Sequence, residues 1–344
     1  MSEPSNNRLR RWWHLPFLLV LIIGTILIVR QHASMPYHHD RGMVFGTIYN
    51  ITYQHSDNLK EEIEAALHQV DLSLSPFNKQ SVISHINDNS DMKTDEMFRE
   101  VFELSKHVSE ATGGAFDITV APLVNAWGFG FKQGIDPERD TIDSLLQLVG
   151  YDKVSINRQG HLTKTDPRVM LDCSAVAKGY GCDIVARLLR NHDVENFMIE
   201  IGGEIVVRGQ NDRGQSWRIG VSKPVDDTLL VNTEQQAILS LTNRALATSG
   251  NYRNFYYKGG KKYAHTINPK TGYPVDHNLL SATVIARDCA TADAWATAFM
   301  VLGADRAKEL LSEHNELEAY LISAAPDGSY VVWYSPSLEK KLQP

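Results

Sequence analysis

Apolar side chains recur at helical spacing in several long stretches of this chain. Between Asp57 and Leu72 they fall every three or four residues, which places them along one face of a helix. The same pattern fills residues 94–112 and ends at a Gly-Gly pair, a common helix stop. Further helices are predicted over residues 81–87, 141–149, 180–191 and 305–313, and from about residue 290 onward.

Short stretches rich in β-branched and aromatic residues predict strands between these helices. They cover residues 43–53, 116–120, 217–221, 236–241, 252–257 and 280–285, and a strand pair over 197–208 bends at Gly202-Gly203. Hairpins are predicted over residues 154–163 and, with an Asp327-Gly328 turn, over 318–334. Because helices and strands do not alternate regularly, a Rossmann-type sheet is excluded. The predicted class is α+β, mixed, with largely antiparallel sheets packed with helices.

The most apolar stretch of the sequence lies near its N-terminus. Residues 15–29 carry no charge. Arginines at positions 8, 10 and 11 precede this stretch, and Arg30 follows it directly. Positive residues ahead of an apolar run are typical of a signal peptide, or of an anchor whose N-terminus stays inside. No clear small-residue cleavage site follows Arg30, which favours the anchor.

We therefore expect a cytoplasmic stub and a transmembrane anchor (or signal anchor) over residues 1–30, a linker over 31–42 and a folded domain over 43–344. The protein would cross the inner (cytoplasmic) membrane once, with this domain on the periplasmic side, and the membrane would be one of its partners. The linker contains His38-His39-Asp40, which can bind a metal ion but is more simply interpreted as a solvated spacer.

Composition and charge exclude some classes of function. The net charge is −7 and no stripe of Lys or Arg runs through the folded domain, so nucleic-acid binding is not expected. The three cysteines, Cys173, Cys182 and Cys289, form no CxxC pair. Neither a disulfide framework nor a zinc site is therefore indicated.

Three candidate chemical features lie close together between Ala247 and Met300. Thr248–Arg253 combines hydroxyls, a glycine, an aromatic ring and a guanidinium, which suits a phosphate-bearing ligand, although a plain turn before a strand is an alternative. His265 enters a turn rich in Pro and Gly, either as a catalyst or as a structural residue. Asp293 and Thr297 are four apart on a helix, so their oxygens share a face and can hold Mg²⁺; Asp293 could instead only stabilise the helix N-terminus.

Two further segments add possible ligand contacts. A strand, a turn of small residues and a helix follow one another over residues 169–191, which leaves free amides for a phosphate that Lys178 could approach. The spacing of a Walker P-loop is missing. The Trp127-Gly128-Phe129 loop can bury aromatic planes against a flat ligand, or can simply pack two aromatic rings.

Taken in order, several of these segments resemble the FAD:protein FMN transferases, the ApbE family. The resemblance covers nearly everything from Met43 to Pro344 and rests on six phrases, FDITVAPLVNAWGFG, LDCSAVAKGYGCD, IEIGGEIVVRG, TSGNYRNFY, HTINPKTGYP and TADAWATAFMVLG. It implies a T-fold-like architecture and an enzyme that uses FAD as substrate and Mg²⁺ as cofactor. Such an enzyme attaches FMN through a phosphoester to a Thr or Ser of an acceptor protein, such as a subunit of a membrane redox complex, and releases AMP.

The resemblance also implies roles for individual residues. The Mg²⁺ ligands would be the side chains of Asp293 and Thr297 and the main-chain carbonyl of Ala175. His265 would be the general base. Contacts with FAD would come from Phe45 (where relatives often have Met), Asn78, Phe116, Asp117, Ile118, Asp172, Lys178, Tyr252, Arg253, His265, Thr266 and Ile267.

Two other functions stay open from the sequence. In a Mg²⁺-dependent FAD pyrophosphatase, water would take the place of the acceptor hydroxyl at the same site. In a flavin-binding carrier there would be no chemistry, although the presence of Asp293, Thr297 and His265 counts against it. The family's usual lipid-bearing cysteine is missing near the N-terminus, and the apolar anchor would replace it.

Overall fold

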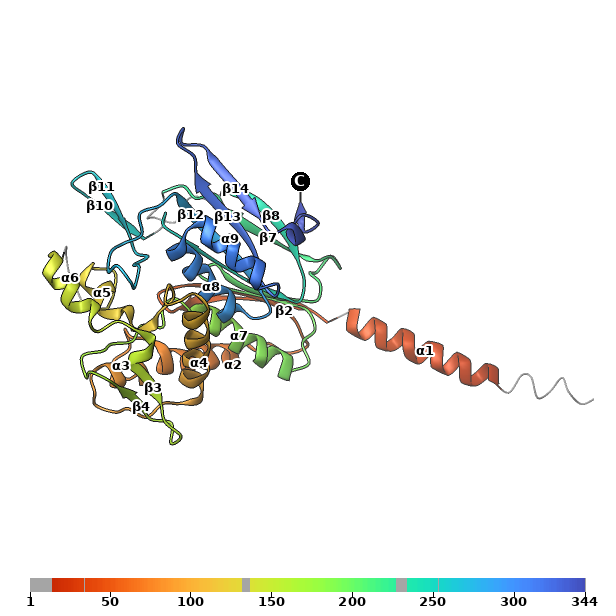
Figure 1. Ribbon diagram of the computed structural model, residues 1–344. Coiled ribbons are helices and arrows are strands. Elements are labelled where there is room, and N and C mark those ends of the chain that lie inside the picture. Colours follow the sequence, from red (N-terminus) through yellow and green to blue (C-terminus); the bar gives the residue numbers. More distant parts are fainter. Residues whose placement is uncertain (1–13, 34, 132–136, 227–233, 253, 344) are drawn as a thin grey trace, which may run out of the picture.

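The computed structural model describes residues 14–33, 35–131, 137–226, 234–252 and 254–343 (Figure 1). Its largest sheet has eight strands in the order β1-β2-β5-β6-β9-β12-β13-β14, and every neighbouring pair is antiparallel. These strands are β1 (Tyr37–Val44), β2 (Thr47–Gln54), β5 (Phe197–Ile201), β6 (Glu204–Arg208), β9 (Arg244–Gly250), β12 (Leu279–Ala286), β13 (Glu318–Ala324) and β14 (Tyr330–Tyr334).

Smaller sheets complete the β structure that is described. A three-stranded sheet has the order β15 (Leu342–Gln343), β8 (Gln235–Leu241) and β7 (Trp217–Ser222). Two hairpins stand apart from it, β3 (Val154–Ile156) with β4 (Leu162–Lys164), and β10 (Phe255–Lys258) with β11 (Lys261–Ala264). The predicted α+β class with largely antiparallel sheets is confirmed.

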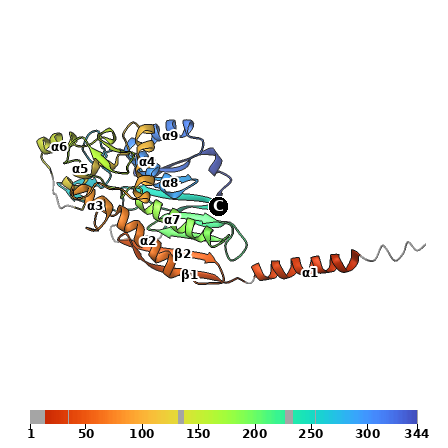
Figure 2. The same cartoon turned by 90° about the horizontal axis from the view of Figure 1, so that it is seen from below.

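Helices and the three-stranded sheet cover opposite faces of the large sheet. Trp217, Ile219 and Leu239 of the small sheet share a buried cluster with Ile285 and Ile322 of the large one. On the other face lie the main helices, as Figures 1 and 2 show. They are α2 (Lys60–Leu74), α4 (Glu96–Ala111), α7 (Ala177–Asn191), α8 (Cys289–Leu302) and α9 (Ala304–Glu313), with the shorter α3 (Val82–Asn87), α5 (Ala121–Ala126) and α6 (Arg139–Leu146) toward one end.

Helix α8 is the central helix of this layer. Nearly all of its side chains are buried, many of them alanines, because it lies between strands β9 and β12 on one side and helices α4 and α7 on the other. Its N-cap Asp288 accepts a hydrogen bond from the Thr291 N–H at 2.9 Å. Small side chains let the neighbouring elements approach closely, and the approach is tightest at Gly179 of α7. A Cβ there would lie 2.4 Å from the Cys289 carbonyl oxygen.

The expected transmembrane anchor is wrong. Helix α1 (His14–Ala33) contains the apolar residues, but among the described residues there is no helix with the length and apolarity that crossing a bilayer requires. Its uncharged apolar part, residues 15–29, rises only about 22 Å at about 1.5 Å per residue, less than the roughly 30 Å hydrocarbon core of a bilayer. The single-pass placement in the inner membrane, which depended on this anchor, is withdrawn with it.

Three further expectations differ from the structure. The linker predicted over residues 31–42 is shorter, because strand β1 already begins at Tyr37 and pairs along its whole length with β2. Asp40, expected to be solvated, is buried and accepts a hydrogen bond from the Tyr53 hydroxyl at 3.0 Å. The strand predicted over 116–120 is instead a short 3₁₀ helix, η1 (Ile118–Val120), which leads directly into α5.

Candidate functional site

One cavity of about 810 Å³ gathers the predicted site residues. Every one of them that the structure describes contributes to its lining; Arg253 lies outside the described residues. The lining comes from the β1–β2 turn, the end of α2, the η1 segment, the start of α7, the end of β9, the turn after β11 and the inner face of α8. Segments far apart in the sequence therefore build a single site.

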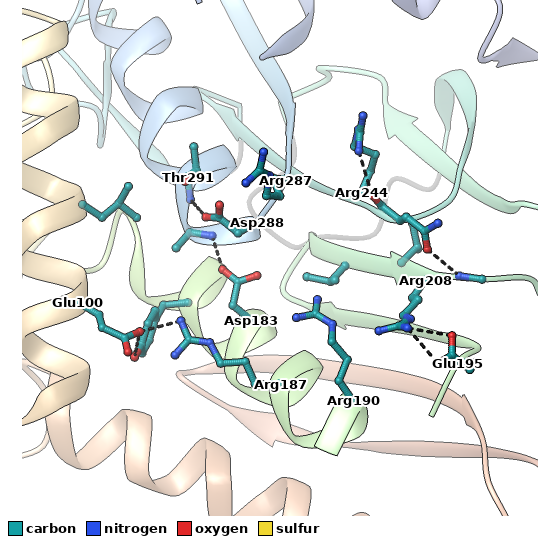
Figure 3. A pocket seen from close by; sticks show the side chains of 17 residues that line it. Glu100, Asp183, Arg187, Arg190, Glu195, Arg208, Arg244, Arg287, Asp288 and Thr291 are labelled. Carbon is teal, nitrogen blue, oxygen red and sulfur yellow. Dashed lines mark hydrogen bonds and ion pairs between the residues drawn. The ribbon is translucent and has the colours of Figure 1, made fainter. Parts of the chain in front are cut away.

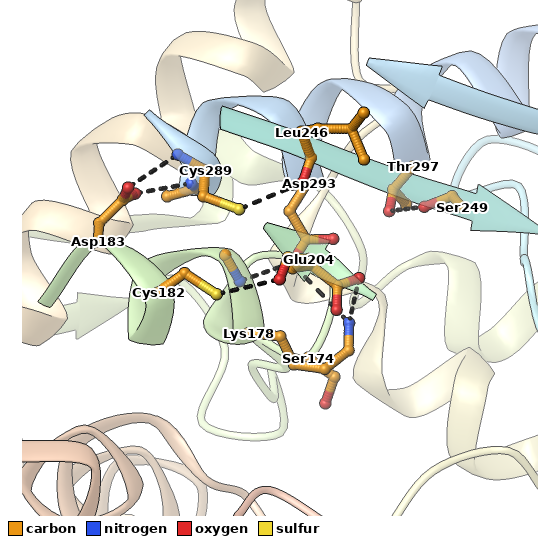
Figure 4. Close-up of polar contacts among 12 residues, drawn as sticks. Ser174, Lys178, Cys182, Asp183, Glu204, Leu246, Ser249, Cys289, Asp293 and Thr297 are labelled. Atoms are coloured by element: carbon orange, nitrogen blue, oxygen red, sulfur yellow. Dashed lines mark hydrogen bonds and ion pairs between the residues drawn. The ribbon is translucent and has the colours of Figure 1, made fainter. Parts of the chain in front are cut away.

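The proposed metal ligands lie where α8 meets α7 and β9 (Figure 4). Asp293 is 2% exposed, and its Oδ2 accepts a hydrogen bond from the Gly179 N–H at 3.1 Å. One turn later on α8, the Thr297 hydroxyl lies 3.1 Å from the Ser249 hydroxyl. Burial raises the pKa of Asp293, although the Lys178 ammonium and the Gly179 N–H favour its charged form.

Lys178, in the first turn of α7, lies between two buried carboxylates. Its Nζ is 2.9 Å from Glu204 Oε1 and 4.0 Å from Asp293 Oδ2. Burial by itself would lower the pKa of Lys178, but Asp293 and Glu204 together raise it above its ordinary value. Burial raises the pKa of Glu204 to about 7, while the Lys178 ammonium lowers it. The ammonium is thus held in its charged form inside the cavity.

The donors at this point fit a magnesium ion. Mg²⁺ prefers hard oxygen ligands and usually takes only one or two carboxylates from the protein, leaving positions for water and substrate phosphates. Asp293 supplies one carboxylate, and Thr297 and the Ala175 carbonyl are neutral oxygens on the same cavity. Within the part of the chain that is described, no group of three or more His, Cys, Asp or Glu is placed to hold a metal.

His265 lies at another part of the cavity wall and is half-buried. Its Nδ1 is 3.2 Å from the Asn254 carbonyl oxygen. A carbonyl can only accept a hydrogen bond, so Nδ1 carries the proton and Nε2 keeps its lone pair. Burial lowers the pKa of His265, so the neutral form is favoured at neutral pH. A neutral imidazole with a free lone pair can act as a base.

The turn after His265 is held rigidly by its own backbone and by aromatic packing. Asn268 N–H donates to the Tyr273 carbonyl at 2.9 Å, and the Trp127 indole N–H donates to the Gly272 carbonyl at 2.8 Å. Trp127 is buried and stacks on Tyr263, so it packs the protein. Phe129, by contrast, lines the cavity. Of the two alternatives predicted for the Trp127-Gly128-Phe129 loop, packing of aromatic rings therefore fits Trp127, and contact with a flat ligand fits Phe129.

Several of the predicted FAD contacts already form hydrogen bonds within the protein. Asp117 caps η1, accepting hydrogen bonds from the Thr119 N–H at 2.8 Å and the Thr119 hydroxyl at 2.7 Å. Asn78 donates to Asp71 at 2.7 Å, and Thr266 donates to the Asn251 side chain at 2.8 Å. Asp172 accepts from the Ser174 N–H at 2.8 Å. These polar groups are held in fixed orientations before any ligand arrives.

Apolar surface completes the cavity. Phe45 lies in the β1–β2 turn at φ 51°, and its ring approaches α7 closely enough that a Cβ at Gly181 would be 2.7 Å from it. Phe116, Ile118, Ile267 and Tyr252 contribute to the same wall. A cavity with apolar walls and a few fixed polar groups is what a flat, partly charged ligand requires.

Sequence reasoning missed some residues of this cavity. Glu204 and Asn254 line it, although the sequence analysis gave neither of them a role in the site. Glu204 is 3% exposed, and a charged residue beside Gly202-Gly203 in an otherwise apolar strand pair was a usable signal. Asn254 gave no signal, because only the tertiary structure brings its carbonyl to His265, whereas Ser249 belongs to the hydroxyl-rich segment that the sequence already marked as a phosphate-binding candidate.

A second cavity of about 770 Å³ lies at the other ends of α7 and α8 (Figure 3). Its lining contains none of the predicted site residues. The Asp183 carboxylate there accepts hydrogen bonds from the Cys289 and Ala290 N–H groups at 2.9 and 2.8 Å. These bonds fix the start of α8 against α7, and so help to place Asp293 and Thr297, which follow about one and two turns later on α8.

Comparison with known proteins agrees with this geometry. The ApbE family model matches residues 45–321. The chain is 37% identical to a FAD:protein FMN transferase from Haemophilus influenzae over 317 residues, 88% of this chain and 90% of the relative. It is 35% identical to the FAD:protein FMN transferase of Escherichia coli, with 88% of each covered.

Solved structures give the same result. The flavin transferase ApbE from Vibrio cholerae superimposes with a TM-score of 0.80 at 33% identity, covering 90% of this chain and all (100%) of that one. The apo form of the Pseudomonas stutzeri flavinyl transferase ApbE gives 0.79 at 30% identity, covering 89% and 97%. The fold, the matched family model and the identity over most of the chain together show that this protein belongs to the ApbE family.

Proposed function

We propose that this chain is an FAD:protein FMN transferase that uses Mg²⁺ and attaches FMN by a phosphoester bond to a threonine or serine of an acceptor protein. The observation that carries the proposal is that one cavity holds both a neutral imidazole, at His265, and a set of hard oxygen ligands beside a fixed ammonium. The first group suits a hydroxyl nucleophile and the second suits a diphosphate.

In this proposal, Asp293, Thr297 and the carbonyl of Ala175 hold the metal ion, whose charge would offset that of the diphosphate. Lys178 adds a second positive charge on the same side of the cavity. Positioning and charge stabilisation dominate the transfer of phosphoryl-type groups, so these fixed charges supply most of what the reaction needs. The surface for FAD comprises Phe45, Asn78, Phe116, Asp117, Ile118, Asp172, Tyr252, Thr266 and Ile267. Arg253, which lies outside the described residues, is proposed as a further FAD contact from the family resemblance alone.

The reaction balances as follows. The acceptor hydroxyl oxygen forms a bond to the phosphorus on the FMN side of the diphosphate, and the bond from that phosphorus to the bridging oxygen breaks. AMP leaves with the electron pair of that bond. The hydroxyl proton passes to Nε2 of His265. General base catalysis of this kind contributes roughly 10²–10⁴-fold to a rate.

The first test mixes the protein, FAD, Mg²⁺ and an acceptor protein that carries a candidate Thr or Ser. We expect the acceptor to gain the mass of FMN and AMP to appear in equal amount. A parallel reaction without acceptor is the control. Rapid release of FMN and AMP there, with no mass gain when acceptor is present, would point to hydrolysis of FAD instead.

The second test isolates His265. His265→Ala is expected to keep its FAD affinity and lose most of the single-turnover rate, because proton removal matters only in the transition state. Thr266 next to it offers a control, since Thr266→Val removes a hydrogen bond to Asn251 but no base. Normal transfer by His265→Ala, or transfer lost only in step with FAD binding, would contradict the role of base.

A further inference from the structure

The contacts of Glu204 indicate a role that neither the family motifs nor the predicted site assigned to it. Its carboxylate is 3% exposed and lies on the wall of the same cavity. Oε1 accepts from Lys178 Nζ at 2.9 Å, whereas Oε2 is buried and has no hydrogen-bond partner among the described residues. A buried carboxylate with one partner depends on that partner for its charge compensation.

Lys178 has two carboxylates within reach and lies closer to one of them. The distance from its Nζ is 2.9 Å to Glu204 and 4.0 Å to Asp293 (Figure 4). Asp293 is the only carboxylate in the proposed metal site, and an ammonium bonded directly to it would compete with a cation for the same oxygens. The position of Lys178 therefore decides whether Asp293 is available.

We propose that Glu204 is a positioning residue that draws the Lys178 ammonium away from Asp293 and so keeps Asp293 open for the divalent cation. This inference rests on the proposed function, because it takes Asp293 as the cation ligand. Strand β6 fixes Glu204 directly after the Gly202-Gly203 turn, and α7 fixes Lys178 at its first turn. Without the Glu204 charge, Asp293 is the remaining carboxylate that pairs with Lys178 in the described part of the chain.

If this proposal holds, the effect of replacing Lys178 on cation affinity depends on whether Glu204 is present. Independent contributions of the two charges to the binding free energy would not produce such a dependence. Removing the Glu204 charge should weaken cation binding, since Lys178 then pairs with Asp293. Removing the Lys178 charge should strengthen cation binding, and the gain should be much larger when Glu204 has also been replaced. If Glu204 instead acts only as an additional negative charge, the two substitutions change the binding free energy independently.

The experiment measures Mn²⁺ binding to the full chain by electron paramagnetic resonance, with Mn²⁺ alone as the probe. The set comprises wild type, Glu204→Gln, Lys178→Met and the double variant. We expect Glu204→Gln to weaken Mn²⁺ binding by about tenfold or more, and Lys178→Met to restore most of that loss in the double variant. Far-ultraviolet circular dichroism and thermal unfolding verify that each variant is folded.

Glu200→Gln is the matched control, because Glu200 lies on the neighbouring strand β5, bonds to Asn50 and is not part of the cavity lining. It is expected to bind Mn²⁺ as wild type does. Additive effects in the four-protein set, or a Glu204→Gln variant with unchanged affinity, would overturn the positioning role. Failure of wild type to bind Mn²⁺, or binding unaffected by Asp293→Ala, would instead contradict the proposed metal site itself.

Discussion

At the scale of single residues, the site is built from groups whose ionisation the fold has already set. Asp293 uses Oδ2 for its contacts with Gly179 and Lys178. His265 keeps its lone pair on Nε2 because Nδ1 is committed to a backbone carbonyl. Each of these two arrangements leads to a separate prediction.

Asp293→Ala is expected to abolish FMN transfer at ordinary Mg²⁺ while leaving the protein folded. A unit charge pair about 4 Å apart contributes about 4 kcal/mol at the effective dielectric constant of a protein site, and about 1.4 kcal/mol corresponds to tenfold, so metal affinity should fall by about 1,000-fold. Thr297→Ala removes only a neutral ligand and should have a smaller effect. Titration of Mg²⁺ in the transfer reaction checks both; a chelator-sensitive wild type beside a fully active Asp293→Ala would contradict the assignment.

The rate of transfer should rise with pH through an ionisation whose pKa lies below that of an ordinary histidine. Burial disfavours the charged imidazolium of His265, so its pKa is lowered and the proton is lost at a lower pH than from an ordinary histidine. At neutral pH the base is then already deprotonated and the rate is flat. Measuring kcat/KM from pH 4.5 to 8 tests this, and a midpoint above 7 would be inconsistent with His265 as the base.

At the scale of elements, the site depends on how closely α7 and α8 approach each other. Lys178 begins one helix and Asp293 lies in the middle of the other, so the separation of the helices sets the distance between these two charges. Gly179 permits the approach, and Asp183 fixes it through the first amides of α8. A change at this contact should therefore alter both stability and the site.

Gly179→Ala tests this contact, because helix propensity and steric crowding predict opposite changes in the free energy of unfolding. Helix propensity alone would make the variant more stable by about 0.5–1 kcal/mol. The added Cβ, however, would lie 2.4 Å from the Cys289 carbonyl oxygen, a backbone atom with little freedom to move. Overpacking of this kind costs about 1–3 kcal/mol, so we expect net destabilisation and weaker metal binding.

Chemical denaturation of the wild type and of Gly179→Ala shows whether the substitution raises or lowers the free energy of unfolding. Gly181→Ala, on the same helix, is the control, because its Cβ would meet the movable ring of Phe45 at 2.7 Å and not a backbone atom. It should lose less stability than Gly179→Ala. A Gly179→Ala variant that is more stable than wild type would show that the helices are not held at their limit of approach.

At the scale of the whole molecule, the site belongs to the folded body, which begins with strand β1 of the large sheet and does not include helix α1. Helix α1 extends away from that body in both views, and most of its apolar side chains are exposed (Figures 1 and 2). None of the extensive contacts between elements in the described structure involves it. The cavity is built entirely from residues 45–301.

A chain that starts at Met35 is therefore expected to fold and to transfer FMN at the rate of the full chain. Its midpoint of thermal unfolding should change by less than about 2 °C, since a larger shift would correspond to about 1 kcal/mol of lost interactions. Differential scanning calorimetry and the transfer assay check the two parts. A marked loss of either would show that the N-terminal residues support the body.

The sequence by itself determined the class of fold, the family and most of the candidate site. Local periodicity marks helices such as α2 and strands such as β13, because a buried face must repeat every 3.6 or every two residues. The position of residues along the family's motifs indicated where Asp293, Thr297 and His265 would act. None of this required knowing which segments meet in space.

Only the tertiary structure decided which side chains share the cavity and in what state. The pattern over residues 116–120 predicts a strand, but residues 118–120 form a 3₁₀ helix, because Asp117 caps that turn and its backbone leads into α5. The pairing of Lys178 with Glu204, and the link from Ser249 to Thr297, join residues 26 and 48 positions apart. No local pattern encodes such pairs, since packing of the sheet against α7 and α8 creates them and burial then fixes their charges.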